Sequence, residues 1–230
     1  MDFFDWLPLV TLVLTGALHR WTFSSLFERY FKLTLVDAPV YSLLFFAGWS
    51  VIFSILFSEQ IVELFQAVSL IGYLVMMFLF LVVFPAVFRY LRALHGKKTP
   101  WLAKLYPGEG MLSLEERYIM AKVGDVFIQQ LIAGITVLLL IKLGFSYPWT
   151  VGLFVGIFGL AHLYLLRTSG VLWGLYYTFF GIMGAFAIPF FIVFIEGGIW
   201  YTFIFHMFLY VLFAIFFAYF PEPSRRTTLS

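Results

Sequence analysis

The sequence contains no cysteine and few charged residues. Of its 230 residues, only 11% are Asp, Glu, Lys or Arg. The absence of cysteine excludes disulfides, thiol nucleophiles and thiolate metal sites, and leaves the redox compartment open. The scarcity of charge argues against a soluble domain, since such domains carry about 25% charged residues. The net charge of +2 gives no electrostatic basis for binding nucleic acid.

Apolar side chains take the place of the missing charges. Hydrophobic residues make up 63% of the chain and aromatic residues 22%, with 31 phenylalanines. Such a composition suits a surface that faces lipid, with aromatic belts at its edges. Asp2 and Asp5 precede the first basic residue, Arg20, whereas a cleaved signal peptide begins with positive charge. We therefore expect a retained first helix and a single integral membrane domain over 1–230, in a bacterial inner (plasma) membrane.

The hydrophobic pattern predicts an all-α polytopic bundle of about seven transmembrane helices. A bilayer core about 30 Å thick needs about 20 apolar residues per helix. The expected helices are 4–19, 39–58, 61–88, 117–143, 148–166, 171–195 and 199–220, with a kink in the third at Pro85. Between them, 20–37 is expected to form an interfacial amphipathic helix and 89–116 a loop, which ends in a capping box at Ser113–Glu116.

The basic residues predict an orientation with the N-terminus outside and the C-terminus in the cytoplasm. Lys and Arg concentrate in cytoplasmic segments of membrane proteins. In this orientation the outer side carries only Lys142. The inner segments carry Arg20, Arg29, Lys32, Arg89, Arg92, Lys97, Lys98, Lys104, Arg117, Arg167, Arg225 and Arg226.

The predicted fourth helix carries the most conspicuous polar group. Lys122, Asp125 and Gln129 are spaced by three and four residues, so they share one helix face. An ionisable group in the hydrocarbon core costs at least about 2.5–3.5 kcal/mol, so these residues require an explanation. One interpretation is a Lys122–Asp125 pair that neutralises itself. The other is a buried carboxylate acting as general base, with Gln129 positioning substrate or water.

Two histidines and two pairs of glycines fall within predicted helices. His162 lies near the cytoplasmic end of the fifth helix and His206 lies in the seventh, and each is compatible with a packing role or a functional one. Glu196 borders a turn on the outer side and is expected to be solvated. The glycines, Gly152 with Gly156 and Gly181 with Gly184, are expected to let helices approach closely.

Taken in order, these residues resemble a known family. Phe158 and His162 match a Phe-x-x-x-His motif, and His206 stands where a His-x-x-x-Asn motif begins. Between them lie the glycines of the sixth helix and a Gly-x-Trp turn at Gly198–Trp200. This arrangement, over about residues 120–215, resembles the CPBP family of CAAX-protease-like (Abi) intramembrane proteases. The motif region of this chain is expected to span about 117–220.

The sequence departs from the family at several positions. The family's first motif is Glu-Glu-x-x-x-Arg, and this chain has Gly124, Asp125 and then Gln129 and Gln130 in that region. If Gln129 replaces the Arg, Asp125 takes the second Glu position; if Gln130 replaces it, Asp125 takes the first. Tyr210 stands where the third motif has Asn.

The resemblance implies an intramembrane peptidase site. In the family, a carboxylate is thought to activate water, and the His and Asn groups to stabilise the oxyanion. Carried over, the catalytic positions are Asp125, His162 and His206, and the substrate or oxyanion positions are Gln129, Gln130, Phe158 and Tyr210. If active, the protein is expected to be a glutamic/CAAX-type endopeptidase with Asp125 as base. If the departures impair catalysis, it is a homologue that binds membrane partners. Either form would act on membrane-embedded or prenylated peptides or membrane proteins, among lipids and without a metal or cofactor.

Two further functional classes remain open from the sequence. Lys122, Asp125 and His162 could line a proton or substrate path in a small transporter or channel-like subunit. The chain could also be an assembly subunit without a site. Convergence of Asp125, His162 and His206 favours the protease-like scaffold, whereas a polar path across the whole bilayer favours transport.

Overall fold

The computed structural model describes 3–23, 25, 30–31, 38–66, 70–78, 82, 86, 89, 116–159, 162–164 and 171–219. Within these residues the fold is entirely helical and contains no strand. The elements are α1 (Phe3–Thr22), α2 (Pro39–Leu56), α3 (Ser58–Gln66), α4 (Leu70–Phe78), α7 (Glu116–Lys142), α8 (Tyr147–Phe154), η3 (Val155–Gly159), η4 (His162–Tyr164), α10 (Val171–Phe194) and α11 (Gly198–Tyr219).

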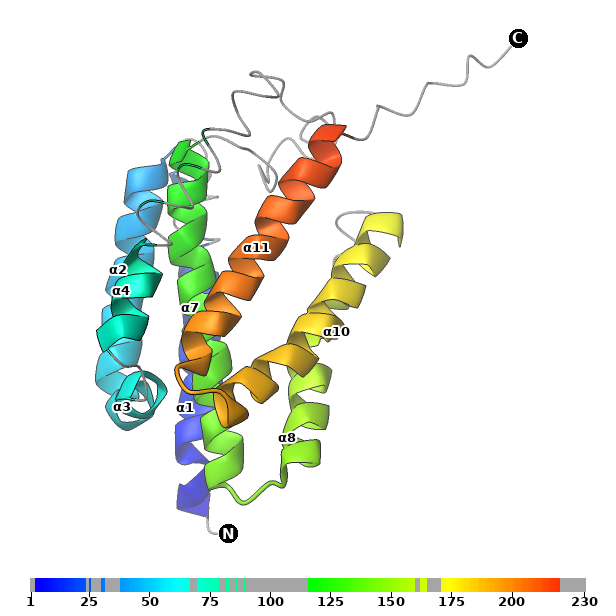
Figure 1. The fold of residues 1–230 in the computed structure, drawn as a ribbon. Helices are drawn as coiled ribbons and strands as arrows, with labels where there is room; N and C mark the ends of the chain where they lie inside the picture. The colour runs from blue at the N-terminus through cyan, green and yellow to red at the C-terminus, as the bar shows by residue number, and fades with distance from the viewer. Residues whose placement is uncertain are drawn as a thin grey trace.

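Helix α7 forms the centre of the bundle. It contacts α1, α2, α3, α8, α10 and α11, and Figure 1 shows it between α2 and α11. In an 18-residue window of its apolar stretch Ala121–Lys142, 67% of the residues are buried, compared with 17% for Tyr177–Phe194 of α10. The side chains of α7 therefore meet other helices, whereas those of α10 lie largely on the surface of the bundle.

Two glycines allow neighbouring helices to pack closely on α7. A methyl group at Gly124 would lie 3.1 Å from Leu43 and 3.2 Å from Phe46, both on α2. At Gly134 it would lie 3.0 Å from Leu64 of α3 and 3.2 Å from Ile199 of α11. The main core cluster surrounds these contacts and includes Leu12, Phe23, Phe46, Trp49, Phe53, Phe57, Leu64, Ile128, Ile135, Leu138, Leu139 and Ile199.

The chain turns by 100° at Phe57, between α2 and α3. Helix α3 thus crosses one end of the bundle, and Figure 1 shows it nearly end-on below α2. Its residues Ile61, Leu64 and Phe65 pack on the core cluster, while Glu59 and Glu63 are exposed. The predicted third helix, 61–88, is therefore not one straight helix, because its first residues belong to α3 and α4 follows as a separate element.

A glycine, Gly144, makes the turn that ends α7 at the same end of the bundle. Gly144 has φ 80°, and after it the amide of Phe145 donates to the carbonyl of Leu140 and the amide of Gly144 to that of Ile141. This is the Schellman pattern that ends helices. Lys142, the last residue of α7, forms an ion pair of 3.2 Å with Glu63 of α3.

Two helices are long and apolar enough to cross a membrane, by length and composition, among the residues searched. They are Ala121–Lys142 and Tyr177–Phe194, and the bent pair Val40–Leu56 with Ser58–Gln66 gives a third. The predicted count of seven spans is thus not confirmed. Large apolar side chains such as Leu14, Leu44 and Ile55 are exposed, as expected for a surface that faces lipid. The predicted amphipathic helix at 20–37 begins inside α1, which extends to Thr22, and 24, 26–29 and 32–37 lie outside the described residues. The kink at Pro85 and all of the loop at 89–116 except its two end residues also lie outside them.

We predict that Gly134→Val destabilises the protein and that Gly152→Val does not. Overfilling a packed core costs about 1–3 kcal/mol, and a side chain at Gly134 meets α3 and α11. Gly152 also lies in a helix, with no described atom within 4 Å of the added methyl group, and serves as the control. The measurement is thermal unfolding of the detergent-solubilised protein. Equal loss of stability in both variants would contradict the packing assigned to Gly134.

Candidate functional site

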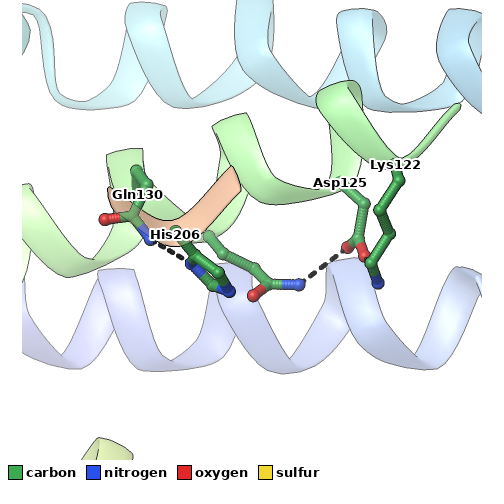
Figure 2. A network of polar contacts seen from close by, with 5 residues as sticks. Lys122, Asp125, Gln130 and His206 are labelled. Carbon is green, nitrogen blue, oxygen red and sulfur yellow. Dashed lines mark hydrogen bonds and ion pairs between the residues drawn. The ribbon is translucent and has the colours of Figure 1, made fainter. Parts of the chain in front are cut away.

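Lys122, Asp125 and Gln129 form one hydrogen-bonded network on α7. The Lys122 ammonium lies 2.5 Å from Oδ2 of Asp125, and Nε2 of Gln129 donates to Oδ1 at 3.0 Å. The side chains of Lys122 and Asp125 are only 9% and 14% exposed. Figure 2 shows Lys122 beside Asp125 and a dashed line for the bond to the carboxylate. The pair expected from the spacing is therefore formed, and Gln129 occupies the carboxylate oxygen that Lys122 leaves.

A second contact joins α7 to α11. The side-chain nitrogen of Gln130 lies 2.6 Å from Nδ1 of His206, and Figure 2 shows the two side chains facing each other. Gln130 is 2% exposed, and its Oε1 is buried without a partner among the described residues. An amide nitrogen can only donate a hydrogen bond and an amide oxygen can only accept one. The end of Gln130 that faces His206 therefore determines whether Nδ1 accepts or donates, and with it the tautomer of the ring.

His162 lies where the fifth predicted helix loses its regular form. Helix α8 ends at Phe154 and is followed by the π-helical turn η3, and His162 begins the 3₁₀ turn η4. Nδ1 of His162 lies 2.8 Å from the backbone carbonyl oxygen of Phe158. The Phe158 ring stacks on Phe154 at a centroid distance of 4.4 Å, so its side chain packs in the core.

The hydrogen bonds described above hold the three predicted catalytic residues to different partners. Asp125 bonds within α7, His206 bonds to Gln130, and His162 bonds to the carbonyl of Phe158. None of these bonds joins one of the three to another. The predicted position Tyr210 lies in α11, and its side chain is outside what the structure describes.

His19 of α1 is a buried ionisable residue that the sequence patterns did not single out. It is 8% exposed, and its ring lies 5.4 Å from that of Trp49 and 5.6 Å from that of Phe45. Its Nε2 is buried without a described partner. The signal was available, since an ionisable residue inside an apolar helix requires an explanation. It was overlooked because His19 ends the predicted first helix and adjoins Arg20, as a solvated boundary residue would.

The glycine pairs do not behave as pairs. Methyl groups at Gly152, Gly156 and Gly184 would meet no described atom within 4 Å. At Gly181, in contrast, a methyl group would lie 2.5 Å from Nδ1 of His162. The expectation that Gly152 and Gly156 bring helices together is therefore wrong for the described contacts. Gly181 makes room for a side chain of the site.

We predict that Lys122→Met lowers stability by about 3–5 kcal/mol, because it leaves the buried carboxylate of Asp125 without its counter-charge. The double variant Lys122→Met/Asp125→Asn should recover most of this loss, since it removes both charges. The measurement is the free energy of unfolding in mixed micelles for the wild type, both single variants and the double variant. Losses that simply add would show that the two charges are not coupled.

Comparison with protein-family models, curated proteins and solved structures finds no match to this chain. The resemblance to the CPBP family thus rests on the motif residues alone.

Proposed function

We propose that this chain is an integral membrane protein with a CPBP-like scaffold, whose site binds a membrane-embedded polypeptide and hydrolyses it poorly or not at all. The observation that carries the proposal is the network on Asp125. One carboxylate oxygen faces the Lys122 ammonium and the other accepts from Gln129. A general base needs a lone pair directed at the water it deprotonates. An ion pair stabilises the unprotonated carboxylate, which makes Asp125 a weaker base.

The other polar groups favour binding over catalysis. His162 and His206 are retained where the family has histidines, whereas Gln129 or Gln130 replaces the Arg and Tyr210 replaces the Asn. Loss of one oxyanion donor costs about a hundred- to thousandfold in rate. His162, whose Nδ1 bonds to its own chain, offers Nε2 for recognising the backbone of a polypeptide.

The transport alternative has less support. Beyond Gln130, the buried side chains of α7 are apolar, apart from Thr136. The Thr136 hydroxyl donates to the carbonyl of Ile132 in its own helix. A path across the bilayer would require further polar side chains along α7. Between Gln130 and Lys142, the described part of α7 does not provide them.

We further propose seven crossings of a bacterial inner membrane, with the N-terminus outside and the C-terminus in the cytoplasm. Figure 1 has the start of α1 and the end of α11 at opposite ends of the bundle. In this topology α3 lies at the outer surface, so the third crossing begins at α4 rather than at 61. The one basic residue of the outer side, Lys142, is paired with Glu63, which offsets its departure from the positive-inside rule.

Cysteine labelling tests this topology, because the natural chain has no cysteine. We expect a cysteine at Glu196 to react with a membrane-impermeant thiol reagent in intact cells. A cysteine at Lys97 should react only after the membrane is opened. Labelling of the Lys97 position alone in intact cells would reverse the orientation.

The functional test measures binding and cleavage together. Purified protein is reconstituted with a panel of fluorescent reporters, both membrane-embedded and prenylated peptides. We expect the wild type to bind at least one reporter with no detectable product by mass spectrometry, and His162→Ala to bind it about tenfold more weakly, as for one lost hydrogen bond.

Each other outcome has a definite meaning. Robust cleavage by the wild type that is lost in Asp125→Asn and His162→Ala would overturn the impaired-enzyme proposal and leave the site in place. Cleavage that both variants retain would overturn the site itself. Failure to bind any reporter in the panel would count against a polypeptide ligand.

A further inference from the structure

The break after α8 brings a backbone carbonyl to His162. The five residues Val155–Gly159 form a π-helical turn, and Gly159 packs closely against Ile182 of α10, with 3.1 Å between a methyl group placed there and that side chain. Short π-helical turns inside helices are frequent at functional sites. Here the Phe158 carbonyl meets Nδ1 of His162 at 2.8 Å, so the irregular turn provides a fixed partner for the imidazole.

Gly181 of α10 provides the surface on which this imidazole rests. A methyl group added at Gly181 would lie 2.5 Å from Nδ1, 2.7 Å from Cγ and 2.9 Å from Cε1 of His162. Any side chain at this position would therefore displace the ring. Gly184, one turn further along the same helix, has no described atom within 4 Å of an added methyl group. Gly181, unlike Gly184, is thus tied to the placement of His162.

The carbonyl contact also decides which ring nitrogen carries the proton. A carbonyl oxygen can only accept a hydrogen bond, so Nδ1 of His162 must be the donor. In the neutral imidazole the other nitrogen, Nε2, then has a free lone pair. Neutral His162 consequently offers an acceptor to a ligand, whereas stabilising an oxyanion requires a donor.

We propose that Gly181 is a positioning residue for His162, and that with the Phe158 carbonyl it fixes the ring as a hydrogen-bond acceptor at Nε2. The ligand group recognised there is an N–H or O–H donor, such as the amide of an extended polypeptide. The ligand part of this inference rests on the proposed function. The contact of the His162 ring with Gly181 and the tautomer of His162 are properties of the protein without ligand.

Nitrogen-15 NMR of histidine-labelled protein in micelles tests the tautomer. The chain has four histidines, and His162→Ala identifies the signals of His162 by their loss. In the wild type and in Gly184→Ala, we expect neutral His162 to carry its proton on Nδ1. In Gly181→Ala we expect this form to be lost. A proton on Nε2 in the wild type, or an unchanged tautomer in Gly181→Ala, would overturn the proposal.

Thermal unfolding tests the contact between His162 and Gly181 without any ligand. Gly181→Ala should lower the apparent Tm in the wild-type background, because the added methyl group meets the ring. In the His162→Ala background the ring is absent, so the same change should not lower Tm. An equal decrease in both backgrounds would show that Gly181 serves some other contact. The double variant also keeps the test valid if Gly181→Ala alone does not fold.

Backbone substitution in the reporter tests the ligand part. In a set of reporters, each backbone N–H is replaced in turn by an ester oxygen, which removes one donor. We expect one replacement to weaken binding to the wild type about tenfold, with no further effect in His162→Ala. Binding insensitive to every replacement would overturn donor recognition. Absence of binding by the unmodified reporter would instead count against the proposed function and leave the tautomer result standing.

Discussion

The burial of α7 on nearly all sides is the constraint on which the rest of the structure depends. Along most of its length, a helix in contact with six other elements has no face on which a charged side chain can be left exposed. A buried charge that lacks a partner costs several kcal/mol. Lys122 and Asp125 are one turn apart and satisfy each other, and Gln129 takes the remaining carboxylate oxygen. The central helix therefore holds two ionisable residues whose charges neutralise each other, which avoids most of the free-energy cost of burying an unpaired charge.

Asp125 and the two histidines, His162 and His206, find their hydrogen-bond partners in two different ways, and the difference bears on the proposed function. The carboxylate is held by residues of its own helix, which neutralise it and stabilise its anionic form. The two histidines are held by other parts of the chain, His206 by Gln130 of another helix and His162 by a carbonyl of the irregular turn. The bond to the Phe158 carbonyl orients the His162 ring through one nitrogen, and under the proposed function the other nitrogen recognises the ligand.

Glycine determines how closely the helices approach, and it acts at particular positions rather than in motifs. Gly124 and Gly134 bring α2, α3 and α11 against α7, whereas Gly152 and Gly156 touch no described neighbour. Gly181 accommodates an imidazole rather than a helix backbone. A small-x-x-x-small spacing shows only that close approach is allowed. Whether a neighbour occupies the space depends on which side of the helix faces the bundle.

The sequence by itself determined the helical class with apolar segments long enough to cross a membrane, the ranges of α1, α2, α7, α10 and α11 to within a few residues, and the spacing of the Lys122–Asp125 pair. Each follows from local properties, since hydropathy, helix periodicity and charge can be read along one segment. Tertiary structure decided the rest. It bent the chain between α2 and α3, because Leu64 and Phe65 gain burial there against the core. It also packed His19 against Phe45 and Trp49, paired Gln130 with His206 and placed His162 against Gly181. These contacts join residues far apart in the chain, and their partners depend on the rotation of each helix about its axis, which no single segment of sequence specifies.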